Sequence, residues 1–196
     1  MEKVISELKI VEEPKQPISM NPKKFAMWLF IGSVIMLFAA FTSGYIVRRA
    51  EGNWVYFDLP EIFFYNTIVI LISSLTLYFA YRAAKKDNLD LVKIWVSITA
   101  TLGVLFLVGQ LRGWDIMANN GIHFVGNPSG SFVIAITFVH VLHMVSAVLV
   151  LLILLVSVFR YEVHSKNLLQ IELCSTYWHF LGGLWLYLFV FLLLYR

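Results

Sequence analysis

The sequence predicts an all-α membrane protein, a polytopic bundle of five transmembrane helices. Its composition is the first observation, because 60% of the residues are hydrophobic, 14% are charged and the mean hydropathy is +0.79, as in polytopic membrane proteins. Charged residues also divide the chain into five apolar runs. The last run, residues 173–195, has no charged side chain and is apolar on every helical face, a surface that a lipid bilayer covers.

The first two predicted spans are bounded by charged residues on both sides. Residues 25–47 lie between a pair of lysines and a pair of arginines, and residues 62–81 lie between Glu61 and Arg82. We expect helices because a backbone exposed to lipid must satisfy its own hydrogen bonds. The runs lack the alternation of a transmembrane strand and are longer than such a strand needs.

The remaining three spans follow the same rule. Residues 94–111 form a short run between Lys93 and Arg112, and the linker after it, about residues 112–130, is the longest of the chain. Residues 131–157 begin after a turn-forming Gly-Asn-Pro-Ser-Gly sequence. The fifth span, residues 173–195, is long enough to cross about 30 Å of hydrocarbon.

The chain thus divides into a tail, residues 1–22, and a five-helix domain, residues 23–196. The first twenty residues carry four Glu, three Lys and two Pro and lack the apolar core of a signal peptide. With the N-terminus inside, eleven Lys and Arg residues lie on the inner side and four on the outer side. The positive-inside rule therefore predicts a cytoplasmic N-terminal tail and a C-terminus outside.

Composition and residue spacing argue against several classes of function, with a small membrane transporter kept as a less favoured alternative. The net charge of +3 is no nucleic-acid signal, because the basic residues flank apolar runs and form no patch. A single cysteine, Cys174, excludes an internal disulfide and a four-thiolate metal site. No Asp or Glu lies deep in a span, whereas a proton- or cation-coupled transporter usually has one there. Ser129 and His140 are too far apart, about 15 Å along a helix, for a protease pair.

Three histidines are the side chains best suited to chemistry. His140 and His143 are three residues apart on one helix face, and His179 lies at a similar depth in the fifth span. A metal or b-type haem site is one interpretation, which would make the chain a membrane electron carrier. The other is a pair of neutral imidazoles whose hydrogen bonds join two helices. We favour the second, because carboxylates that would complete a metal site are missing at that depth.

No residue is therefore expected to be catalytic, to bind a cofactor or to bind a metal. Small residues such as Gly32 and Gly182 mark faces where helices approach closely. Basic residues at the inner side suit anionic lipid headgroups, and Glu172 suits a helix start. The candidates for helix packing or lipid contact are Trp28, His140, His143, Arg160, Lys166, Glu172, Trp178 and His179.

Five motifs, in order, resemble subunit III of the haem–copper respiratory oxidases, over nearly the whole chain from Lys23 on. The opening of the first span, K-F-A-M-W-L-F, is similar to the family's R/K-F-G-M-W-L-F, and Glu172 precedes His179 by seven residues, as a family glutamate does. The other matching motifs are L-P…N-T…S-S-L-T at 59–76, G-Q…W at 109–114, N-P-S-G-S…T…H…H at 127–143 and Y-W-H-F…W at 177–185.

The chain also departs from the family pattern. It resembles the last five spans of the seven-span members, in agreement with the N-inside count. Three acids of the family fall on Val34, Gly113 and Gly182 here, so the roles of those acids do not carry over.

The resemblance implies a non-catalytic subunit of a complex that reduces oxygen to water and conserves energy as a proton gradient. Haems and copper would belong to partner subunits, and this chain would bind no cofactor apart from phospholipid. Its partners would be oxidase subunit I, as the main contact, other oxidase subunits and membrane lipid, without nucleic acid. The resemblance implies a multi-pass protein of the bacterial cytoplasmic (inner) membrane and allows membership of a respiratory supercomplex.

Overall fold

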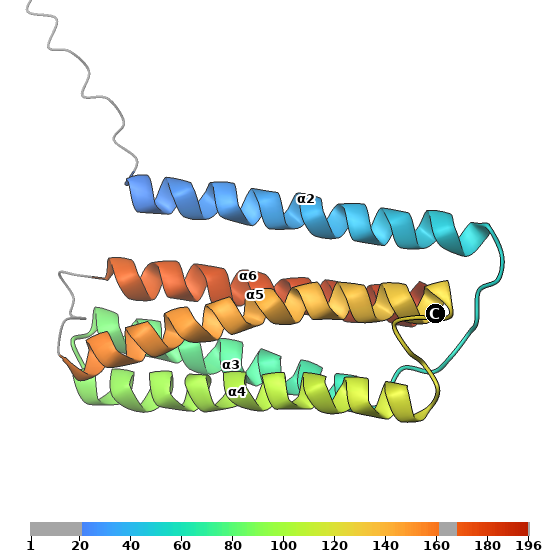
Figure 1. Ribbon diagram of the computed structural model, residues 1–196. Coiled ribbons are helices and arrows are strands. Elements are labelled where there is room, and N and C mark those ends of the chain that lie inside the picture. Colours follow the sequence, from blue (N-terminus) through green and yellow to red (C-terminus); the bar gives the residue numbers. More distant parts are fainter. Residues whose placement is uncertain (1–20, 161–167, 196) are drawn as a thin grey trace, which may run out of the picture.

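The computed structural model describes residues 21–160 and 168–195, which form long helices and contain no strand. In chain order the helices are α2 (Pro22–Ala50), α3 (Ile62–Lys85), α4 (Leu89–Asn119), α5 (Pro128–Phe159) and α6 (Leu169–Tyr195). Each is long and apolar enough to cross a membrane, which confirms the predicted fold class. Successive helices run in opposite directions, so the described chain starts at one end of the bundle and finishes at the other (Figure 1).

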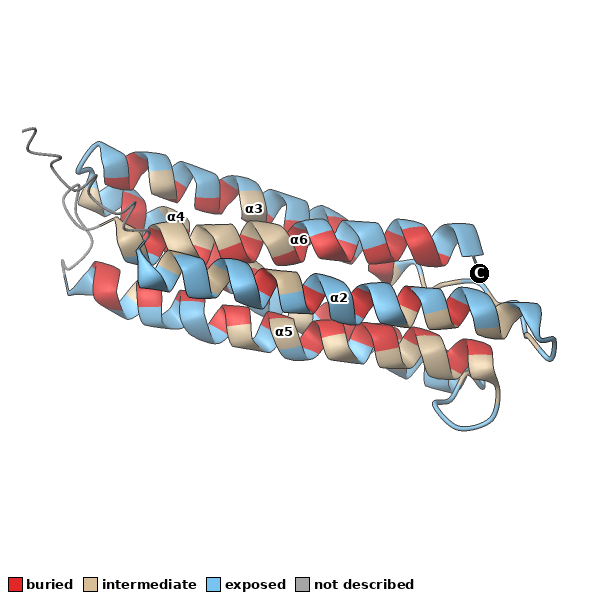
Figure 2. Ribbon diagram, turned by 90° about the horizontal axis from the view of Figure 1, so that it is seen from above, coloured by how far each residue is buried: buried red, intermediate tan, exposed pale blue. Residues whose placement is uncertain are grey.

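Four of the helices form a closed bundle, and α2 lies against its outside. α3 and α5 each pack against both α4 and α6, whereas α2 contacts only α5 and α6 among the described helices (Figure 1). Much of α2 is exposed (Figure 2), and its buried residues repeat every three or four positions along one face. These are Ile31, Val34, Phe38, Thr42 and Tyr45.

Asparagine begins three of the helices. The side-chain oxygens of Asn21, Asn88 and Asn127 accept hydrogen bonds from backbone N–H groups of the first turn, at 3.0, 3.4 and 2.9 Å. Proline follows Asn21 and Asn127, at the first helical position, where its missing N–H has no helical partner in any case. These caps explain why the helices start where they do.

The helices extend past the predicted spans, most of all α4. The third span was predicted as residues 94–111, but α4 has 31 residues and includes Arg112 and Trp114. The long linker predicted over residues 112–130 is therefore wrong in its first part. The reason is that hydropathy detects only the apolar section of a helix, which continues into polar surroundings until a stop. Here the stop is Gly121, whose φ of +78° suits glycine.

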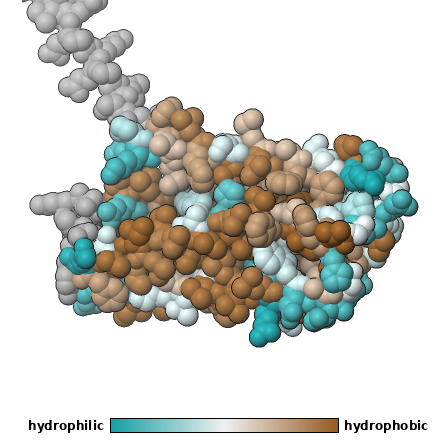
Figure 3. Space-filling model, viewed as in Figure 1, coloured by the Kyte–Doolittle hydropathy of each residue, from teal (hydrophilic) through white to brown (hydrophobic). Residues whose placement is uncertain are grey.

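The surface matches a chain surrounded by lipid. On the face seen in Figure 3, hydrophobic residues cover the middle of the bundle and hydrophilic residues gather at both ends. Large apolar side chains are exposed along every helix, for example Leu29, Leu71, Leu105, Leu149 and Leu194. A soluble protein rarely exposes so large an apolar surface.

Candidate functional site

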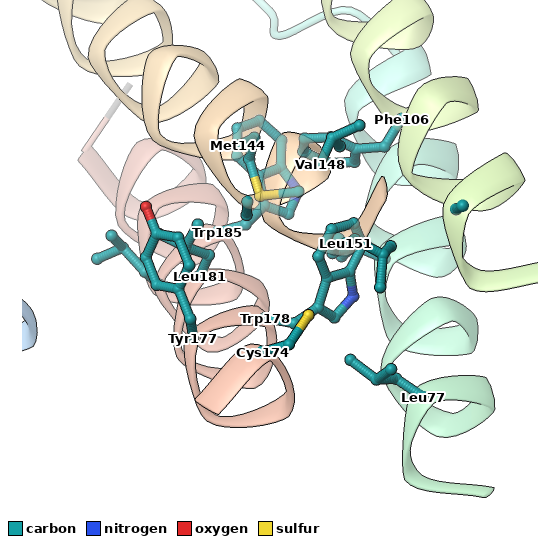
Figure 4. Close-up of a cluster of buried hydrophobic side chains, with 14 of the residues drawn as sticks. Leu77, Phe106, Met144, Val148, Leu151, Cys174, Tyr177, Trp178, Leu181 and Trp185 are labelled. Atoms are coloured by element: carbon teal, nitrogen blue, oxygen red, sulfur yellow. The ribbon is translucent and has the colours of Figure 1, made fainter. Parts of the chain in front are cut away.

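Trp178 of α6 lies at the centre of the bundle. Its side chain is fully buried and directed toward Leu77 of α3 and Leu151 of α5 (Figure 4). Its indole Nε1 donates a hydrogen bond to Oγ of Ser73 on α3, at 3.1 Å. On α4, Gly103 leaves room for the ring, because a Cβ there would lie 2.6 Å from Cη2 of Trp178. This side chain therefore joins α6 to three neighbouring helices.

Tyr177 points to the other side of α6 (Figure 4) and joins this helix to α5 and α2. Its hydroxyl lies 2.7 Å from Oγ of Ser146 on α5, and its ring packs edge-on against Phe30 of α2, with centroids 5.5 Å apart. Neighbouring residues of a helix point about 100° apart. Tyr177 and Trp178 can therefore serve two different interfaces.

Trp185 repeats this arrangement two turns further along α6. Its Nε1 donates to Oγ1 of Thr67 on α3 at 3.0 Å, and its ring lies 5.3 Å from those of Phe106 and His140. The motif at residues 59–76 contains Thr67 and Ser73, but the sequence does not identify them, or Ser146, as hydrogen-bond partners of α6. A usable signal exists, since a hydroxyl residue inside an apolar span often marks a helix interface.

The histidines pack separately. The imidazole of His140 is fully buried among the rings of Phe38, Phe106 and Trp185, and Nδ1 of His143 lies 2.7 Å from the carbonyl of Val139 on the same helix. In the described chain no hydrogen bond joins His143 to His179. The predicted imidazole pair between α5 and α6 is thus not formed. Since His179 is two positions from Tyr177, it points about 200° away from the side of α6 that meets Ser146.

The remaining candidates that the structure describes are exposed or partly exposed. Glu172 pairs with Lys24, and this bond ties the start of α6 to the start of α2. Trp28 on α2 is 62% exposed and points away from the bundle, and Arg160 is exposed at the end of α5. Lys166 lies outside the described residues. Trp28 and Arg160 thus stay candidates for contact with lipid or with a partner chain.

Breaking the pair of Lys24 and Glu172 should have a small effect. The Nζ–Oε1 distance is 2.7 Å, but each side chain is 39% exposed, so water screens the attraction. We expect Lys24→Gln to lower the free energy of unfolding by about 0.2–1 kcal/mol, measured by thermal unfolding in detergent. The control is Lys23→Gln, because no described carboxylate pairs with Lys23. An effect of Lys24→Gln no larger than that of the control would contradict the prediction.

The three positions at which the resemblance implies acids are tightly packed. Val34 is buried on the inner face of α2. A Cβ on Gly113 would overlap Cε1 of Phe63, and one on Gly182 would lie 3.1 Å from Oγ of Ser74. A carboxylate therefore does not fit at position 113 unless Phe63 moves.

An apolar groove runs between α2 and α6 and has a volume of about 590 Å³. Thr42 and Tyr187 lie in it, with a 3.2 Å hydrogen bond from the Tyr187 hydroxyl to Oγ1 of Thr42. At the end of the groove, the guanidinium of Arg49 lies over the rings of Tyr56 and Tyr195, at 5.7 and 5.8 Å. The lining residues are Thr42, Ile46, Gly183, Leu186, Tyr187, Val190, Phe191, Leu194 and Tyr195.

In the described part of the chain, no three or more His, Cys, Asp or Glu side chains come together as a metal site would need. What the arrangement provides is a braced bundle with hydroxyl–indole bonds between its helices, an apolar outer surface and an apolar groove between α2 and α6.

Comparison with known proteins gives the family. The chain is 26% identical over 170 residues to a cytochrome c oxidase subunit 3 of Corynebacterium diphtheriae, covering 83% of this chain and 82% of the relative. It is 26% identical over 176 residues to a probable quinol oxidase subunit 3 of Staphylococcus saprophyticus, covering 86% and 87%. The family model for cytochrome c oxidase subunit III matches residues 3–196. This bacterial membrane protein with five apolar helices therefore belongs to the cytochrome c oxidase subunit III family.

Proposed function

We propose that this chain is the non-catalytic subunit III of a haem–copper terminal oxidase and braces subunit I in the bacterial cytoplasmic membrane. Haems and copper belong to partner subunits, and the electron donor is either cytochrome c or a quinol. The proposal rests on the hydrogen bonds between helices. The buried side chains of Tyr177, Trp178 and Trp185 on α6 each form a hydrogen bond with a side chain of a neighbouring helix. Such bonds make a stiff support, and the family match supports its place in an oxidase.

The ends of the bundle support an N-inside orientation. Seven described Lys and Arg residues lie at the end where α2 starts, and three lie at the opposite end. This excess favours the cytoplasm for the first end. The first group is Lys23, Lys24, Arg82, Lys85, Lys86, Lys93 and Arg160, and the second is Arg48, Arg49 and Arg112.

Purification from native membranes tests the proposal. A tagged chain extracted in mild detergent should bring with it a haem-bearing oxidase subunit I, and the complex should reduce oxygen. The same chain purified alone should give a flat reduced-minus-oxidised spectrum. A haem α-band from the isolated chain would identify it as an electron carrier instead, and recovery without any oxidase subunit would also overturn the proposal.

The groove between α2 and α6 suits a phospholipid as the structural lipid of this subunit. Its apolar lining matches an acyl chain, and Arg49 at its end suits the phosphate. Arg49 is oriented by two tyrosine rings, and no described carboxylate pairs with it. In the N-inside orientation this lipid lies in the outer leaflet.

Arg49→Gln should weaken the retention of this lipid about tenfold or more, the value of a lost charge-assisted hydrogen bond. The measurement is native mass spectrometry of the purified complex. Arg48→Gln is the matched control, because Arg48 pairs with Glu51 at 3.2 Å. Gly183→Leu should also displace the lipid, since the space beside Gly183 is open. Equal lipid content in all three variants would refute the site.

A further inference from the structure

Gln110 of α4 and His140 of α5 are fully buried, and their polar atoms have no hydrogen-bond partner in the protein. The unpartnered atoms are both ring nitrogens of His140 and both the oxygen and the nitrogen of the Gln110 amide. A buried polar group left unsatisfied destabilises the fold, because it gives up its hydrogen bonds to water and gains none in return. Native proteins therefore pair nearly all such groups, with protein or with ordered water.

These two side chains lie at one level of the bundle, on neighbouring helices. Nε1 of Trp114 on α4 donates to Oγ1 of Thr137 on α5 at 3.0 Å, which fixes the register of the two helices. Gln110 is one turn before Trp114, and His140 is nearly one turn after Thr137. Since α4 and α5 run in opposite directions (Figure 1), both steps lead the same way along the bundle.

A second contact confirms this level. The ring of Phe106, one turn beyond Gln110, lies 6.2 Å from that of His140. His140 thus lies at a height between those of Phe106 and Trp114. Gln110 lies between the same two residues on α4, so the two side chains are at one level. On α4, Gly109 faces Asn66 of α3 and Trp114 faces Thr137 of α5. Around the axis of α4, Gln110 projects at an angle between these two directions, so it points into the bundle.

Elsewhere the bundle pairs its buried polar groups across helices. Trp178 bonds to Ser73, Trp185 bonds to Thr67 and Thr76 lies 2.8 Å from Thr99. Within the described residues, unpartnered buried side-chain atoms occur only on Gln110 and His140. Because Gln110 and His140 lie at the same level of the bundle, a single hydrogen-bond partner can serve both side chains.

We propose that Gln110 and His140 form a binding site for buried water that bridges α4 and α5. A neutral imidazole offers one donor and one acceptor, and a carboxamide offers donors and an acceptor. A water molecule can donate to the imidazole and accept from the amide, so it complements both. A cation is a poor fit, because no described helix places a buried carboxylate at this depth.

Radiolytic footprinting in H₂¹⁸O tests the site on the chain in its native complex or membranes. Hydroxyl radicals formed from bound water label the nearest side chains. Trp185, whose ring is 5.3 Å from His140, should take up several-fold more ¹⁸O than Trp178. Trp178 is a matched control because it is an equally buried tryptophan on the same helix and bonds to Ser73. Equal labelling of the two would overturn the proposal.

A double variant provides the second readout. Gln110→Leu with His140→Phe replaces both polar side chains by apolar ones of similar size, so the labelling of Trp185 should fall to the level of Trp178. Each single variant leaves one polar group unpaired and should be less stable than the double variant. Labelling that persists in the double variant, or a high-resolution map with a direct bond between the two side chains, also overturns the proposal. The native comparison decides by itself if the double variant does not assemble.

Discussion

Trp178→Ala should lower the free energy of unfolding by about 3–5 kcal/mol, the range for deletion of a large buried aromatic side chain. The ring is fully buried. It bonds to Ser73 of α3, lies against Gly103 of α4 and points toward Leu151 of α5 (Figure 4). Inside a bilayer, lipid does not drive helices together as water does, so packing and interhelical hydrogen bonds hold the bundle. The loss should appear as a lower midpoint temperature of the purified complex and a lower yield of this chain.

Two further variants separate the loss of packing from the loss of the hydrogen bond. Trp28→Ala removes the same side chain from a position that is 62% exposed, so the four-helix core should keep its stability. Trp178→Phe keeps most of the packing and loses the hydrogen bond to Ser73, which should cost about 0.5–1.5 kcal/mol for the bond itself. If Trp178→Ala changed stability no more than Trp28→Ala, the central role of Trp178 would be wrong.

The number and order of the helices could be predicted from sequence because each helix needs an apolar run to cross the bilayer, and charges separate these runs. The residues at which the helices end could not be predicted, as α4 shows. Arg112 and Asp115 end the apolar run, yet the helix continues to Asn119. Polar residues are compatible with a helix that projects beyond the hydrocarbon, so hydropathy underestimates its length.

The contacts inside the bundle were harder to predict. α6 is apolar on every side, so its sequence does not reveal which face points inward. The Y-W-H-F…W motif contains Tyr177 and Trp178, but only the structure assigns Trp178 to Ser73 and Tyr177 to Ser146. The bond expected from His179 is made by Tyr177 instead. Gln110 belongs to the G-Q…W motif, but its lack of a hydrogen-bond partner could not be predicted, because it depends on which polar groups the neighbouring helices place beside it.

Gly113→Glu should be strongly damaging, although the family pattern that the sequence resembles has an acid at this position. Phe63 of α3 is buried and occupies the space that a Cβ at position 113 would need. Overpacking of this kind costs about 1–3 kcal/mol, and an unpaired buried carboxylate adds about 3–5 kcal/mol. The chain should therefore fail to accumulate in membranes, as measured by immunoblot and by the yield of the complex.

Smaller substitutions at position 113 separate the cost of overpacking from the cost of the buried charge. Gly113→Ala brings the clash without the charge and should show the overpacking cost alone, as a drop in the midpoint temperature. Gly32→Ala is the matched control, because no atom lies within 4 Å of a Cβ at that position. Shortening the neighbour, in Gly113→Ala with Phe63→Leu, should recover part of the loss. If Gly113→Ala proved as harmless as Gly32→Ala, close packing of α3 on α4 would not explain the missing acid.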